Sequence, residues 1–198
     1  MPSKRDYKQA LAYAKAQRER PSRSWEGYCQ MFVRKAYGID SLYGSAIAQW
    51  YGLASGDKHA GGHPDDAPVG SALFFAGGKY GHVMLAGGPF KNGTKGAWSN
   101  DLVRLGKIDK VRRTAPITAW GHRYLGYGTA INGIDLRYKT PPLKTPPLKK
   151  YISIAQAVDR MEAALERAVK DGDKSDIKVL KAEIKHLKHL HDTLRKGD

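Results

Sequence analysis

The chain of 198 residues contains a single cysteine, Cys29. One thiol excludes an intramolecular disulfide framework and any zinc site built from several cysteines. No run of about 18 apolar residues occurs, so the sequence offers no ordinary membrane-spanning helix. The N-terminus has no apolar stretch behind its basic residues, so we expect synthesis without a signal peptide. A packed core, rather than covalent crosslinks, must therefore hold the fold together.

Acidic residues are also scarce: 19 Asp and Glu face 34 Lys and Arg, giving a net charge of +15. The excess of basic residues extends over both sides of Tyr138. Such a surface favours polyanions, namely nucleic acid, an anionic membrane or an anionic cell wall. Composition alone does not choose among these partners.

The first part of the chain predicts helices followed by short strands. Apolar spacing and breaking residues predict three helices, a loop over 57–68, and then strands bounded by glycines. The expected helices are 6–20, 30–37 and 46–53, and the expected strands are 71–75, 81–86, 97–103 and one or two within 120–136. Helices first and short strands afterwards predict an α+β fold with an antiparallel sheet.

A repeated unit, Lys-Thr-Pro-Pro-Leu, occurs twice between Lys139 and Leu148. Proline pairs keep a segment extended, so we expect a semi-rigid linker over 139–150. This linker divides the chain into an N-terminal domain, 1–138, and a C-terminal segment, 151–198.

The C-terminal segment predicts two amphipathic helices joined by a turn at 171–175. Ser153 with Gln156 forms a capping-box pattern at the start of the first helix. One helical hairpin cannot cover both of its apolar stripes. We therefore expect 151–198 to form a homo-oligomer, to dock on another protein or to bind the cell wall. A solubilising tail is the plainer alternative.

Cys29 is predicted to lie in the first turn of a helix, after the breaking residues 21–24. Unpaired N–H groups and the helix dipole at this position favour a thiolate, which is the nucleophilic form of cysteine. The alternative is a buried cysteine that acts as a small hydrophobic residue.

His82 is predicted at the start of a strand, from which its imidazole could face Cys29 and take the thiol proton. A third polar group usually fixes the orientation of such an imidazole. The next strand offers Ser99, Asn100 and Asp101. In a regular strand Ser99 and Asp101 share one face, and Asn100 points to the other.

Four blocks in this order resemble the CHAP family, the cysteine, histidine-dependent amidohydrolases/peptidases. Gly27-Tyr-Cys-Gln-Met-Phe-Val33 resembles its cysteine motif, and 68–75 with Gly81-His-Val83 resembles its second block. Trp98-Ser-Asn-Asp-Leu102 lies where the third polar residue is expected. The segment 120–134 is similar to the closing strands of CHAP-like domains in endolysins from phages of actinobacteria. The resemblance spans roughly residues 6–137.

The resemblance implies a papain-like fold and hydrolysis of amide bonds in bacterial peptidoglycan. The enzyme would be an N-acetylmuramoyl-L-alanine amidase or a stem or cross-bridge endopeptidase. Carried across, Cys29 is the nucleophile, His82 the general base and then acid, and Asp101 the orienting residue, with Asn100 as second choice. No cofactor or metal is implied. Synthesis in the host cytoplasm and action on the wall after release are likewise implied by the resemblance, and a basic C-terminal segment would suit anionic wall polymers.

The oxyanion would be stabilised by the Cys29 backbone N–H and one further donor. Papain-like enzymes often place a glutamine about six residues before the cysteine, and here that position is Arg23. Tyr28 and Arg23 are the candidates for the second donor, and Trp98 is a candidate for contact with substrate.

Two other functions stay open at this point. His59 and His63 could bind zinc with Cys29 or Asp65 in a zinc-dependent wall hydrolase, although the Gly-Gly between the histidines excludes the usual helical spacing. A basic nucleic-acid-binding protein could stack bases on exposed aromatic residues. The absence of a recognised motif disfavours it. The aromatic candidates are Trp98, Trp120, Tyr124 and Tyr127.

Overall fold

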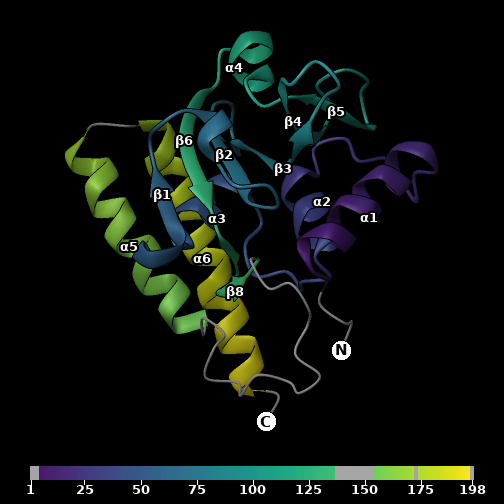
Figure 1. Ribbon diagram of the computed structural model, residues 1–198. Coiled ribbons are helices and arrows are strands. Elements are labelled where there is room, and N and C mark those ends of the chain that lie inside the picture. Colours follow the sequence, from purple (N-terminus) through teal and green to yellow (C-terminus); the bar gives the residue numbers. More distant parts are fainter. Residues whose placement is uncertain (1–4, 137–153, 172–173, 197–198) are drawn as a thin grey trace.

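The computed structural model describes residues 5–136, 154–171 and 174–196 (Figure 1). Three helices open the chain, as predicted: α1 (Tyr7–Glu19), α2 (Cys29–Ala36) and α3 (Ala46–Gly52). Asp6 and Gln9 form a reciprocal capping box at the start of α1, and Ser45 caps α3. Helix α2 has no side-chain cap at its first turn. Its N–H groups are therefore left for other partners.

A six-stranded sheet follows, with every neighbouring pair antiparallel and the order β1-β6-β2-β3-β4-β5. Its strands are β1 (Lys58–Ala60), β2 (Ala72–Ala76), β3 (His82–Pro89), β4 (Lys95–Asn100), β5 (Ile108–Arg112) and β6 (Arg123–Gly128). The smaller elements are the 3-10 turns η1 (Ser55–Asp57) and η2 (Pro64–Asp66), helix α4 (Ala115–Trp120), and a separate pair, β7 (Ala130–Ile131) and β8 (Ile134–Asp135). The predicted α+β class with an antiparallel sheet is confirmed.

Three elements differ from the sequence-based expectation. Strand β1 lies within the segment predicted as a loop, and β5 and α4 were not predicted. Strand β1 has three residues and α4 has six, so neither is long enough to show a period in its apolar residues. Strand β1 forms because its backbone pairs with β6, a contact that local sequence does not encode.

Strand alternation gives the sheet two apolar faces. Phe74, Val83 and Leu85 lie on one face of the sheet and pack against α1, α2 and α3. Phe75 and Met84 belong to a second core on the opposite face. Beside that core, the buried guanidinium of Arg113 donates to backbone carbonyls in three separate segments, those of Pro64 and Ala67, of Gly87 and of Gly96.

The C-terminal hairpin, α5 (Ile154–Lys170) and α6 (Lys174–Lys196), packs on the outer side of α3 (Figure 1). Tyr43 and Ala48 join Met161, Leu180 and Leu187 in one buried cluster. Tyr43 and α3 therefore cover the buried part of the hairpin's apolar stripe within the same chain, and oligomerisation or wall binding through 151–198 stays a prediction.

Polar contacts reinforce this packing. The Gly44 N–H donates to the Glu183 carboxylate at 2.5 Å, and Arg160 donates to the Gly52 carbonyl at 3.1 Å. Tyr51 also donates to Asp176. The predicted linker, 139–150, and the predicted Ser153 cap lie outside the described residues. Within the described ranges, no helix combines the length and apolar composition that crossing a bilayer requires.

The packing predicts that the hairpin and the sheet unfold together. All four tryptophans precede the hairpin in sequence, so their fluorescence reports on the N-terminal part alone. Met161→Ala removes a fully buried side chain and should lower the free energy of unfolding by about 2–5 kcal/mol. The tryptophan-detected denaturation midpoint should fall with it. Val169→Ala, on the same helix but 56% exposed, is the matched control. An unchanged tryptophan midpoint in Met161→Ala would show that the hairpin folds separately.

Candidate active site

Antiparallel pairing brings distant segments to one end of the sheet. Phe75 pairs with His82, Ala76 with Arg123, and Leu85 with Trp98. The ends of β2 and β4 therefore lie beside the beginnings of β3 and β6. Helix α2 reaches the same end, because the Gly27 N–H donates to the Asp101 carboxylate at 2.9 Å. We refer to the region around Cys29, His82 and Asp101 as the catalytic end, after the role proposed for it below.

Cys29 is the first residue of α2, and only 8% of its surface is exposed. The backbone N–H groups of Val83 and Gln30 lie near its sulfur and act to lower its pKa. Burial nevertheless raises the pKa of Cys29 to about 11, and the Asp101 carboxylate adds to that rise. The expected bias toward a thiolate is therefore not realised. Loss of water around the sulfur outweighs the N–H groups, and the resting residue is a neutral thiol.

His82 begins β3 and is also buried, and burial lowers its pKa to about 3, with a further contribution from His122. The Nε2 atom lies 2.7 Å from the Ser99 hydroxyl oxygen. That hydroxyl donates its single proton to the Asn100 carbonyl at 3.2 Å. The donor in the Nε2–Ser99 pair depends on the tautomer: when Nε2 carries the ring proton it donates to Ser99, and Nδ1 is then the nitrogen that can accept a proton.

Ser99 is thus the residue that hydrogen-bonds to the imidazole. Neither Asp101 nor Asn100 lies in the orienting position that the resemblance implies. The Asp101 carboxylate instead accepts the N–H groups of Gly27 and Gly106, the latter at 2.6 Å. The Asn100 amide donates to the Trp25 carbonyl at 2.8 Å and to Asp101 at 2.5 Å. Asp101 leaves the regular strand with φ of 64°, which turns its side chain from the imidazole toward the loop that precedes Cys29.

Cys29 lies beside the backbone that follows His82, and the two side chains are not joined. The N–H of Val83, the residue after His82, lies near the sulfur and acts to lower its pKa. By strand alternation the imidazole lies on the other face of the sheet, with Phe75 and Met84. Among the described residues, no hydrogen bond joins the sulfur to the ring, so direct proton transfer between them requires the ring to move toward the sulfur.

Two aromatic residues at this end have no counterpart in the sequence-based site. The Trp120 ring meets the His82 ring edge-on, with centroids 5.0 Å apart, and is 39% exposed. The His122 ring lies 5.3 Å from Trp120, and burial lowers its pKa. Gly77, with φ of 148°, makes room for this ring, since a Cβ there would lie 2.1 Å from the His122 Cδ2. Trp120 begins a block that carries the resemblance, but no sequence signal places it or His122 at His82, because that position depends on the tertiary packing of α4 and the residues after it.

The remaining predicted residues are placed as follows. The Arg23 guanidinium lies 4.3 Å from the centroid of the Tyr28 ring, and Tyr28 is 43% exposed beside Cys29. Both are therefore available at the catalytic end. Trp98 is not: its ring is buried in the core that faces the helices, so the expectation that it contacts substrate is corrected.

The residues proposed for zinc have other partners. His59 stacks on Tyr127 with centroids 4.4 Å apart, and His63 Nδ1 accepts the N–H of Asp65 at 3.2 Å. Across 5–136, 154–171 and 174–196, no three side chains of histidine, cysteine, aspartate or glutamate converge as ligands. The nucleic-acid alternative also loses candidates for stacking, because Trp98 is buried and one face of Tyr127 is occupied by His59.

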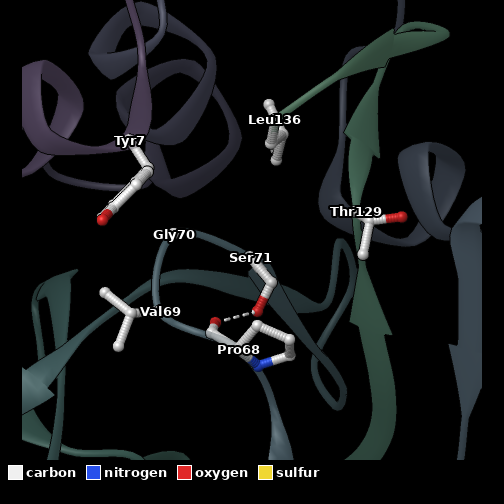
Figure 2. A pocket seen from close by; sticks show the side chains of 7 residues that line it. All are labelled: Tyr7, Pro68, Val69, Gly70, Ser71, Thr129 and Leu136. Carbon is white, nitrogen blue, oxygen red and sulfur yellow. Dashed lines mark hydrogen bonds between the residues drawn. The ribbon is translucent and has the colours of Figure 1, made fainter. Parts of the chain in front are cut away.

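A cavity of about 270 Å³ lies elsewhere, between α1 and the segments that lead into β2 and out of β6 (Figure 2). It is lined by Tyr7, Pro68, Val69, Gly70, Ser71, Thr129 and Leu136. The Ser71 hydroxyl donates to the Pro68 carbonyl at 2.6 Å. The cavity adjoins the start of β2, whereas His82 pairs near its end, so this space is not part of the catalytic end.

Comparisons with protein-family models, with curated proteins and with solved structures return no match to this chain. Its function must therefore be argued from its residues and their geometry.

The hydrogen bonds predict different consequences for two neighbouring substitutions. Ser99→Ala removes the partner of Nε2 and should lower kcat for the cleavage proposed below about 10- to 100-fold. Because the buried ring loses its partner, it should also lower the free energy of unfolding by about 1–3 kcal/mol. Asp101→Ala should lower the free energy of unfolding by about 1–3 kcal/mol, because buried or partly buried N–H groups lose their acceptor. Steady-state kinetics and urea denaturation of both variants test this assignment. A silent Ser99→Ala with a fully stable, inactive Asp101→Ala would restore Asp101 as the orienting residue.

The pKa shifts predict how reactivity depends on pH. With the pKa of Cys29 raised to about 11, the thiolate fraction grows about tenfold per pH unit at every pH below that value. Alkylation by iodoacetamide should therefore rise with a slope near one from about pH 5 to 9. A thiolate–imidazolium pair would instead give a plateau across this range. Quenching the reaction at timed intervals and measuring the alkylated fraction by intact-protein mass spectrometry distinguishes the neutral thiol from the thiolate–imidazolium pair.

Proposed function

We propose that this chain is a cysteine-dependent hydrolase with a papain-like fold that cleaves amide bonds in bacterial peptidoglycan, as phage endolysins do. The observation that carries the proposal is the position of Cys29 at the uncapped first turn of α2, next to the backbone of Val83, which follows His82, whose Nε2 lies against Ser99. The resemblance of four ordered sequence blocks to the CHAP family supports the choice of reaction. The net charge of +15 suits an anionic wall.

The chemistry begins from a neutral thiol and a neutral imidazole. As the sulfur attacks the amide carbonyl, its proton passes to His82 Nδ1 and a carbon–sulfur bond forms. Backbone N–H groups of the first turn of α2, that of Cys29 among them, stabilise the negative oxygen of the tetrahedral intermediate. The carbon–nitrogen bond then breaks, and His82 gives its proton to the leaving amine.

Hydrolysis of the thioester completes the cycle. Water attacks the thioester carbonyl and gives a proton to His82, and the carbon–sulfur bond breaks. The products are a carboxylic acid and the regenerated thiol. Burial keeps the imidazole neutral above about pH 3 but also makes it a weak base, so the proton transfer requires substrate binding to bring the pKa values of the thiol and the ring closer together. Ser99 keeps the ring in the tautomer that the reaction needs.

The remaining parts of the proposal follow the resemblance. The scissile bond is the muramoyl–alanine amide or a peptide bond of the stem or cross-bridge. The chain would be made in the host cytoplasm and would act on the wall after release. A basic nucleic-acid-binding protein without catalysis is the second candidate, favoured only by the net charge.

Substitution of the two reacting residues tests the proposal. Cys29→Ser and His82→Ala should each lower the release of fragments from purified actinobacterial walls by at least about 10³-fold, because bond-making and proton transfer are lost. Circular dichroism should show that both variants fold. Val69→Ala, at the distant cavity, is the control and should digest walls at the wild-type rate. Wall digestion by a folded Cys29→Ser variant at the wild-type rate would exclude this mechanism.

A further inference from the structure

Helix α6 carries a row of lysines on its solvent-exposed side. Four exposed lysines recur at intervals of four, three and four residues, and we call them the lysine row: Lys174, Lys178, Lys181 and Lys185. At 3.6 residues per turn they lie within about 60° of one another around the helix axis and span about 16 Å along it. Lys188 continues the line but pairs with Glu162 of α5 at 2.6 Å, and Asp192 ends it.

The acidic residues of α6 that lie within this stretch face the rest of the protein. Asp176 is buried and accepts a hydrogen bond from Tyr51, and Glu183 accepts the Gly44 N–H. Both bonds hold α6 against α3 and the loop before it. Between the parts of the chain that the structure describes, no ion pair involves the lysine row. Its positive charge is therefore left for a partner.

The surroundings of the lysine row indicate which kind of partner it suits. The described part of α6 exposes no large apolar side chain that could enter a hydrocarbon layer. The two helices, 154–170 and 174–196, contain no tryptophan, tyrosine or phenylalanine on which nucleic-acid bases could stack. Single polyanion strands are bound in grooves, whereas these lysines project from the convex side of a helix. The row therefore suits a broad anionic surface that is recognised by charge alone.

We propose that the lysine row binds the anionic phospholipid headgroups of a membrane surface. Helices α5 and α6 form one side of the molecule, and their buried contacts with Tyr43 and α3 hold the row in place (Figure 1). Because the four lysines share one side of the helix, they can approach a plane of negative charge together. Each lysine close to an anionic membrane strengthens binding about fivefold. Binding is peripheral, and it does not depend on the proposed hydrolysis.

Co-sedimentation of the full-length chain with vesicles tests the inference. Phosphatidylcholine vesicles that contain about 30% phosphatidylglycerol should bind the chain, and pure phosphatidylcholine vesicles should not. Raising the salt concentration from about 0.05 M to about 0.5 M should release the bound chain, because the attraction is screened. Equal binding to both kinds of vesicle, or binding that salt leaves unchanged, would overturn the inference.

Charge-matched variants separate the lysine row from the net charge. The row variant, K178Q/K181Q/K185Q, should bind the anionic vesicles about 100-fold more weakly than the wild type. The control, K8Q/K91Q/K95Q, removes the same charge from exposed positions outside the hairpin and should bind within about threefold of the wild type. Circular dichroism should show that both variants fold. Equal losses in the two variants would overturn the inference, because binding would then follow net charge.

Two further arms distinguish lipid from other polyanions and from catalysis. The row variant should digest lipid-free purified walls at the wild-type rate and should bind duplex DNA as the wild type does. Loss of wall digestion or DNA binding in the row variant, without loss of vesicle binding, would overturn the inference and assign the row to that polymer. Intact, row-dependent vesicle binding in a chain that digests no walls would support the inference and contradict the proposed function.

Discussion

The arrangement of the catalytic end depends on the carboxylate of Asp101. It accepts the N–H of Gly27, in the loop before Cys29, and the N–H of Gly106, in the loop after β4. The Asn100 amide adds a third donor and also holds the Trp25 carbonyl. These bonds fix the start of α2 against the end of the sheet. Asp101 adopts a left-handed backbone conformation, which is unfavourable for a residue with a Cβ, and its hydrogen bonds compensate for that strain.

Burial affects the pKa of Cys29 more strongly than its position at the start of α2 does. The pKa of Cys29 is raised and that of His82 is lowered, so both residues are neutral in the resting protein. A neutral pair is compatible with hydrolysis when the proton moves as the sulfur attacks. It also requires the imidazole, which lies on the sheet face opposite to the sulfur, to reach the sulfur when substrate binds.

The sequence predicts most of the scaffold, because the first three helices and the main strands have clear caps, periods and glycine boundaries. Cys29 at a helix start and His82 at a strand start follow from these local signals. The partner of His82 does not, because choosing Ser99 over Asp101 requires the backbone turn at Asp101. Trp120 and His122 depend on how the six-residue α4 packs. The sequence also does not show what the apolar side of the hairpin packs against, because its contact with α3 is made between distant parts of the chain.

The account rests on the claim that the thiol of Cys29 is the attacking group. Because the chain has one cysteine, a thiol-selective reagent labels this position alone. The most direct measurement labels the protein with a maleimide at neutral pH, where amines react little, and compares the labelled fraction with the remaining rate of wall digestion. We predict that digestion falls in proportion to labelling and vanishes at full labelling. Fully alkylated protein that digests walls at the original rate would contradict the account.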